Sequence, residues 1–251
     1  TKAITVKINI LKILVLVVLC SNQGRSEFGS ETIKTSSRSI LFFGNSITAG
    51  YGVGREKAFP AHIQSRIDSI GWNFHVVNAG LSGETSAAGV RRIDWVLRQP
   101  VDVFVLELGG NDGLRGLPLK QTEKNLSDIL SRVRAKNNKT ELVIAGMQLP
   151  PNLGPVYTNN FQTIFPRLAQ DSGALLIPFL LEGVGGNKNL MSKDGIHPNT
   201  AGHEEIANIV WTTLAPLLAK MSTDSVDLPQ NRKGRGQVNA TTAEHSDQNG
   251  D

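Results

Sequence analysis

The chain has 251 residues and a formal net charge of +4, and its length fits one α/β domain with a substantial core plus extensions. Its basic residues are scattered and do not alternate with aromatic side chains, so the composition gives little support to nucleic-acid binding. Cys20 is the only cysteine, which excludes an intramolecular disulfide and a cysteine nucleophile in the rest of the chain.

The first predicted element is an export signal over residues 1–20. Three lysines lie within the first twelve residues, and Ile13 to Leu19 then form an apolar run that ends at Cys20. Seven uninterrupted apolar residues are too few to span a bilayer. We therefore expect an exported, periplasmic protein. The alternative is a membrane-anchored lipoprotein with a lipid on Cys20, although Leu19 is larger than the residue usual before such a cysteine.

Beyond the signal, composition divides the chain into three parts. Residues 21–38 are polar and predict a linker, residues 39–220 carry the apolar patterning of a folded domain, and residues 221–251 nearly lack apolar side chains. The last segment is therefore predicted to be a disordered tail.

Within residues 39–220, buried strands alternate with amphipathic helices. Ile63, Ile67 and Ile70 share one helical face, and a final helix is expected over residues 201–220. Proline-rich residues 148–160 and glycine-rich residues 182–193 are expected to be loops. Strands that are apolar on both faces predict a mostly parallel sheet covered by helices on both sides, an α/β/α fold. The strands are predicted at residues 40–43, 74–77, 101–108, 142–146 and 174–177.

Ser46 stands where the first predicted strand ends, two residues after Gly44. In open parallel sheets the functional crevice lies outside the carboxyl ends of the strands, so this serine is a candidate nucleophile as well as an ordinary turn residue. A serine hydroxyl needs an adjacent base, and the base needs a carboxylate that fixes its tautomer. His197 and Asp194, three residues apart with Gly195 between them, could supply both groups.

Four ordered blocks resemble the markers of the SGNH, or GDSL, hydrolase family. Gly83 and Asn111 each follow a predicted strand, as Ser46 does, and His197 completes the order. The stretch from Leu106 to Gly116 is nearly identical to that of the bacterial branch that contains acyl-CoA thioesterase I, also called lysophospholipase and arylesterase. The resemblance covers roughly residues 39 to 218. It implies the three-layer, flavodoxin-like α/β/α sandwich that the strand and helix pattern also predicts.

The resemblance also implies a mechanism without a metal or other cofactor. Ser46 would attack the acyl carbonyl, His197 would transfer the proton, and Asp194 would orient the imidazole. The backbone amides of Ser46 and Gly83 and the side-chain amide of Asn111 would form the oxyanion hole. Read without the family, Gly83 could be a simple turn glycine and Asn111 a loop asparagine that bonds its own backbone.

Two residues near these blocks are unusual. Asn45 stands where the family name implies aspartate, which affects the surroundings of the nucleophile more than the triad. Glu107 lies within an apolar strand and is predicted to be a paired, buried carboxylate. The other histidines are weaker candidates for the base, and His203 is expected at a helix start. No pair of histidine, cysteine or carboxylate residues has the spacing of a zinc site.

Three functions follow from these patterns. The first is a serine esterase or thioesterase that acts as a monomer on small-molecule aryl, fatty acyl or lysophospholipid esters. The second is a carbohydrate deacetylase, and the third is an inactive binding domain on the cell surface. A complete set of catalytic residue types argues against the third function, and export argues against cytoplasmic acyl-CoA as the physiological substrate.

Overall fold

The computed structural model describes residues 37–224, so the predicted signal, Cys20 and most of the predicted linker and tail lie outside the described residues. The strands are β1 (Arg38–Gly44), β2 (Phe74–Asn78), β3 (Val103–Glu107), β4 (Glu141–Ala145) and β5 (Leu175–Ile177). The α-helices are α2 (Ser46–Ala49), α3 (Phe59–Ile70), α4 (Ser86–Val96), α5 (Gly110–Leu114), α6 (Leu119–Lys136), α7 (Pro155–Gln162), α8 (Ile164–Ser172) and α9 (Thr200–Asp224). Two short 3₁₀ helices, η1 (Arg55–Lys57) and η2 (Pro151–Leu153), complete the described elements.

The five strands form one parallel sheet in the order β2-β1-β3-β4-β5. All five predicted strands are present. The central strands β1 and β3 are buried on both faces, as continuous apolar runs predict, whereas the edge strands β2 and β5 are partly exposed. After β1 the chain adds β2 on one side, and β3 to β5 then follow on the other side of β1, so a topological switch point lies between β1 and β3. Ligands of open α/β sheets bind at such a point, beyond the carboxyl ends of the strands. Ser46 follows β1 and Asn111 follows β3, so both lie at that edge.

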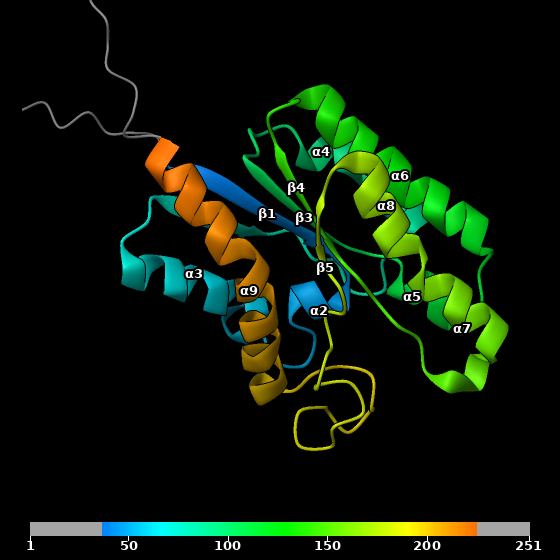
Figure 1. The fold of residues 1–251 in the computed structure, drawn as a ribbon. Helices are drawn as coiled ribbons and strands as arrows, with labels where there is room; N and C mark the ends of the chain where they lie inside the picture. Colours follow the sequence, from blue (N-terminus) through cyan, green and yellow to red (C-terminus); the bar gives the residue numbers. More distant parts are fainter. Residues whose placement is uncertain (1–36, 225–251) are drawn as a thin grey trace, which may run out of the picture. The chain divides into compact units, whose positions relative to one another are not determined.

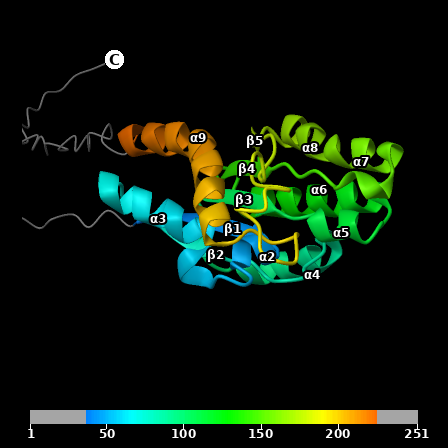
Figure 2. The ribbon, with the colours of Figure 1, turned by 90° about the horizontal axis from the view of Figure 1, so that it is seen from below.

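Helices cover both faces of the sheet (Figures 1 and 2). Helices α3 and α9 pack together on one face, and α4, α6 and α8 form the layer on the other. The apolar positions of α6 that share a face (Leu126, Ile129, Leu130 and Val133) are all buried. Full burial of such a side chain contributes about 1.5–3 kcal/mol. The prediction of a three-layer α/β/α fold is confirmed.

The structure departs from the sequence prediction at three places. Ile70 is 50% exposed, because α3 ends there and Gly71 turns the chain away in a left-handed conformation. The expected loop at residues 148–160 contains η2 and the start of α7, because Pro155 occupies the first turn, where its missing N–H costs no hydrogen bond. Helix α9 continues to Asp224, four residues beyond the expected end of the domain. Within residues 37–224, no helix has both the length and the hydropathy needed to cross a bilayer.

Candidate active site

A sharp turn at the end of β1 presents Ser46. The Asn45 side chain caps α2, since its Oδ1 accepts the backbone N–H of Ile47 at 2.9 Å, and Gly50 ends the helix with a φ of 77°. Ser46 is the first residue of α2 and is largely buried, with 8% of its surface exposed. A strand on one side and a capped turn on the other therefore fix the position of its hydroxyl.

His197 comes from the loop before α9 and meets Ser46 across a separation of 151 residues. Its Nε2 lies 3.0 Å from Ser46 Oγ. The loop is closed by backbone bonds, from Ser192 N–H to His197 O at 2.7 Å and from Asn199 N–H to Leu190 O at 2.9 Å. These bonds hold the imidazole beside the nucleophile.

Asp194 binds the other side of the His197 ring. Its Oδ2 lies 2.6 Å from His197 Nδ1, and its Oδ1 accepts the backbone N–H groups of Ile196 and His197 at 2.9 and 3.0 Å. The backbone bond from His197, followed by the ring bond and the bond from Ile196, lowers the pKa of Asp194 to about 2. The carboxylate is thus an anion at neutral pH, which favours a proton on Nδ1 and leaves Nε2 as an acceptor.

Sequence reasoning missed Tyr51, whose ring lies against His197 with 4.5 Å between centroids and 43° between planes. The Tyr51 N–H donates to Ser46 O at 3.0 Å, so the nucleophile turn positions this ring directly. Tyr51 is 54% exposed. An aromatic residue in the short segment Gly50 to Gly52 was a signal that could have indicated it, because exposed aromatic residues in turns are uncommon.

Gly83 lies in a turn that is bonded to the nucleophile turn. Leu81 N–H donates to Gly44 O at 2.9 Å, and Asn78 Nδ2 donates to Thr48 O at 2.7 Å. Gly83 has a φ of 79°, which side chains rarely permit. Among the described residues, the N–H groups of Ser46 and Gly83 have no hydrogen-bond acceptor, so both remain able to bind a ligand oxygen.

Asn111 lies in α5 and bonds across to the turn that contains Gly83. Its Nδ2 donates to the backbone oxygen of Glu84 at 3.0 Å. An amide NH₂ group carries two N–H donors, and this bond uses one of them. The bond does not go to the residue's own local backbone, as the alternative interpretation expected, but to a turn far away in the sequence, and it joins the second and third motif blocks.

The neighbouring Asp112 secures α5 beneath this contact. It is buried, and its two oxygens accept the Ser86 N–H at 2.8 Å and the Ser86 hydroxyl at 2.5 Å. These bonds fix the start of α4 to α5. No pattern in the sequence indicated this role, because Ser86 and Asp112 meet only in the folded chain.

A protein-family model for the GDSL-like lipase/acylhydrolase family matches residues 42–205, which include all five predicted site residues. The chain belongs to this family. Its chemistry is therefore that of an ester hydrolase, as the first of the three predicted functions states.

Similar proteins carry related names. The chain is 39% identical over 188 residues to "Esterase TesA" of Pseudomonas aeruginosa, covering 74% of this chain and 92% of that protein. It is 39% identical over 180 residues to "Thioesterase 1/protease 1/lysophospholipase L1" of Escherichia coli, covering 71% and 84%. The structure of the psychrotrophic esterase EstA from Pseudoalteromonas, inhibited by monoethylphosphonate, matches with a TM-score of 0.68 and 31% identity, covering 72% of this chain and 99% of that chain.

This family member has a buried carboxylate directly beneath its nucleophile turn. Glu107 is fully buried, and its partners are hydrogen-bond donors of Asn45 and Thr48 rather than a cation. Burial raises its pKa to about 7, although the bonds from Thr48 and Asn45 act in the opposite direction. The predicted burial is confirmed, and the carboxylate is paired with neutral hydrogen-bond donors rather than with a cation.

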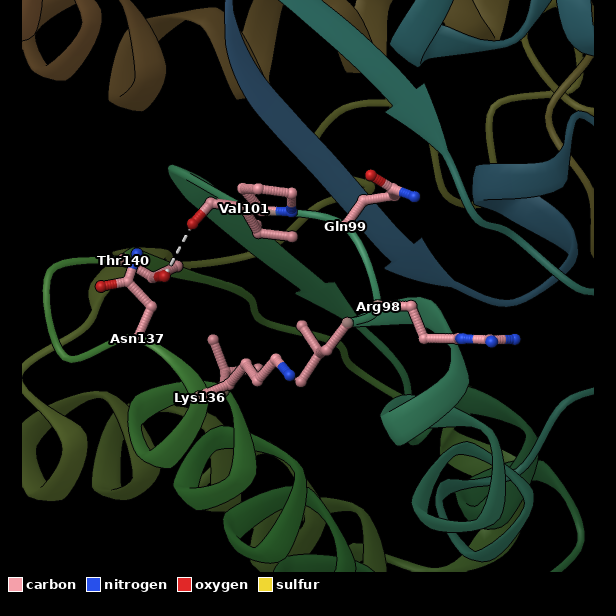
Figure 3. A pocket seen from close by; sticks show the side chains of 9 residues that line it. Arg98, Gln99, Val101, Lys136, Asn137 and Thr140 are labelled. Atoms are coloured by element: carbon pink, nitrogen blue, oxygen red, sulfur yellow. Dashed lines mark hydrogen bonds between the residues drawn. The ribbon is translucent and has the colours of Figure 1, made fainter.

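A pocket of about 220 Å³ lies at the opposite edge of the sheet (Figure 3). Val101 and Thr140, which precede β3 and β4, line it, and Lys136 borders it at the end of α6. The Thr140 hydroxyl donates to Val101 O at 2.7 Å. Because parallel strands place their amino ends on the edge away from Ser46, this pocket is separate from the site described above.

Proposed function

We propose that Ser46, His197 and Asp194 form the catalytic triad of this ester hydrolase. The observation that carries the proposal is the unbroken chain of contacts from Ser46 Oγ to His197 Nε2 at 3.0 Å and from His197 Nδ1 to Asp194 Oδ2 at 2.6 Å. A nucleophile, a base and a group that orients the base are the minimum set for activating a serine hydroxyl.

In the first half of the reaction, Ser46 Oγ attacks the acyl carbonyl carbon while its proton moves to His197 Nε2. The tetrahedral intermediate then collapses, and His197 gives the proton to the departing oxygen or sulfur. The products of this half are an acyl ester on Ser46 and a free alcohol or thiol. Asp194 stays ionised and stabilises the imidazolium between the two proton transfers.

Water completes the cycle by the same route. His197 takes a proton from water, the water oxygen attacks the acyl-enzyme, and the proton returns to Ser46 Oγ as the carboxylic acid leaves. His197 must be neutral to accept each of these protons.

The oxyanion would be held by the N–H groups of Ser46 and Gly83 and by the second N–H of Asn111. The absence of an acceptor for the two backbone donors within the described residues supports this assignment. Such donors are already oriented before the charge develops, which makes them worth more in the transition state than in the ground state.

We propose aryl, fatty acyl or lysophospholipid esters and thioesters as substrates. Four exposed apolar side chains belong to the turns that carry the site residues, and they suit an apolar acyl or aryl group better than an acetylated sugar. They are Tyr51, Leu81, Leu114 and Ile196. The names of the similar esterase and thioesterase/lysophospholipase agree with this class.

A panel of p-nitrophenyl esters from acetate to palmitate, with an acetylated sugar beside it, tests the substrate class. We expect the longer esters to exceed the sugar in kcat/KM, and the reverse order would favour a deacetylase. Ser46→Ala should lower kcat on the order of 10⁶-fold and abolish labelling by a phosphonate. Ser69→Ala, an exposed serine on α3, is the matched control. Full turnover by Ser46→Ala would remove the triad.

We also propose that the enzyme is exported and acts as a monomer. The lysine-flanked apolar run that ends at Cys20 supports export. Cell fractionation of the full chain and of Cys20→Ser distinguishes a lipid-anchored protein from a free periplasmic one. Release of the variant from membranes indicates a lipid anchor, whereas identical fractionation indicates ordinary secretion into the periplasm.

A further inference from the structure

The carboxylate of Glu107 is the common acceptor for the residues on both sides of Ser46. Its Oε1 accepts Asn45 Nδ2 at 2.7 Å, and its Oε2 accepts Thr48 Oγ1 at 2.8 Å. The backbone N–H groups of Asn45 and Thr48 donate to Oε2 as well, at 3.1 and 3.3 Å. Four donors thus converge on one fully buried side chain.

The backbone leaves room for this carboxylate only because residue 44 is glycine. Gly44 pairs with Glu107 across β1 and β3. A Cβ atom at position 44 would lie 2.5 Å from Glu107 Oε2 and 2.1 Å from Thr48 Oγ1. The end of β1 is therefore shaped around the carboxylate and its partners.

Glu107 also decides which way the Asn45 amide points. With Nδ2 on the carboxylate, Asn45 Oδ1 accepts the Ile47 N–H at 2.9 Å and lies 3.4 Å from Ser46 Oγ. The opposite orientation would place Oδ1 against a carboxylate oxygen and Nδ2 against an N–H donor, and both contacts repel. The carboxylate thus fixes the helix cap that fixes Ser46.

We propose that the Glu107 carboxyl group is a positioning residue for the nucleophile Ser46, and that Asn45 is the side-chain donor matched to it. This inference rests on the proposed role of Ser46. With aspartate at position 45, the 2.7 Å contact would join two carboxyl groups, which would have to share a proton. Asparagine removes that requirement, because its amide donates without a charge.

The two-residue exchange Glu107→Gln with Asn45→Asp tests the proposal. Glu107→Gln alone turns one acceptor into a donor, which must face either Asn45 Nδ2 or the Thr48 donors. We expect kcat to fall about 10- to 100-fold with KM nearly unchanged, as for a misplaced reacting group. In the double variant, the side chain at position 107 donates a hydrogen bond to the side chain at position 45, the reverse of the wild-type bond, and every other contact of the two side chains is kept. It should return kcat to within about threefold of wild type.

Thr140→Val is the matched control, because it also removes a buried side-chain hydrogen bond but at the opposite edge of the sheet. It should lose thermal stability and keep its kcat per folded molecule. Wild-type kcat in Glu107→Gln, or a double variant as slow as Glu107→Gln, would overturn the inference. Ser46→Ala, measured in parallel, separates the proposed triad from the proposed role of Glu107. An active Ser46→Ala variant would contradict the triad itself, whereas an inactive one leaves the result for Glu107→Gln as a test of positioning alone.

Discussion

Two carboxylates lie on opposite sides of the Ser46–His197 contact, and their surroundings differ sharply. Glu107 is fully buried beneath the nucleophile turn, whereas the Asp194 side chain is 39% exposed on a loop. Burial raises the pKa of Glu107 to about 7, and hydrogen bonds from His197 and Ile196 lower that of Asp194 to about 2. The serine is therefore positioned by the interior and the histidine by local backbone bonds, so the two halves of the site should respond differently to substitution.

Among the substitutions that test this comparison, the largest effect should come from the exposed carboxylate. Asp194→Asn keeps the shape but favours the wrong imidazole tautomer, so we expect kcat to fall about 10⁴-fold. Thermal unfolding should change little, because the residue is at the surface. Asp171→Asn, an exposed residue on α8, should change neither quantity. A rate within tenfold of wild type for Asp194→Asn would show that the loop does not supply the orienting group.

On the nucleophile side, Asn111→Ala should lower kcat by about 10²- to 10³-fold, roughly 2.7–4 kcal/mol, with KM changed little. A donor that acts on the developing oxyanion affects the chemical step more than binding. Steady-state kinetics must be paired with a melting curve, because the bond to Glu84 O also joins two turns. If the lost activity merely follows the unfolded fraction, Asn111 has only that structural role.

Glu107 should make the free energy of unfolding depend on pH, because the buried side chain is more stable in the folded protein when it is protonated. Its pKa is raised from 4.5 to about 7 in the folded chain, so its contribution is complete below about pH 4.5 and is lost as pH rises through 7. The loss is on the order of 3 kcal/mol. Urea unfolding should therefore show wild type weakening relative to Glu107→Gln between about pH 4.5 and 7.

His203 provides the internal control for that comparison. Burial, then the charges of His62 and His197, lowers its pKa to about 4, so its contribution is present above about pH 6.5 and lost as pH falls towards 4. This term has the opposite sign and is common to wild type and Glu107→Gln, so it cancels in their difference. Parallel stability curves for the two proteins would mean that Glu107 is not a costly buried anion.

The smallest effect should come from Tyr51→Leu. Loss of the ring contact with His197 should cost about 0.5–1.5 kcal/mol, which corresponds to a roughly two- to tenfold lower kcat. Trp95→Leu, an exposed aromatic residue on α4, is the control. Equal kinetics for both variants would show that the bonds within residues 190–199 hold His197 without help from the tyrosine.

The sequence allowed prediction of the sheet because buried strands are nearly continuous apolar runs, as at residues 40–43. It also allowed the candidate site to be proposed, because Ser46, Gly83, Asn111, Asp194 and His197 stand in motifs, and the contacts of Ser46 with His197 and of His197 with Asp194 agree with that proposal. It failed where contacts between distant segments decide a role. Thr48 and Asp112 look like ordinary turn residues until the fold brings Glu107 and Ser86 to them. His203 lies in the first turn of α9, as expected, but the sequence did not indicate that it is fully buried and that its Nδ1 accepts the Phe59 N–H at 3.3 Å.

The contact between Ser46 and His197 also sets when the enzyme can first act. The two residues are 151 positions apart, and His197 lies three residues before α9, the last described helix. During synthesis the serine leaves the ribosome well before the histidine, and at about 5–20 residues per second the delay is roughly 8 to 30 s. Under the proposed mechanism, the serine of a nascent chain has no base to activate it, so hydrolysis cannot begin until nearly the whole domain has been made.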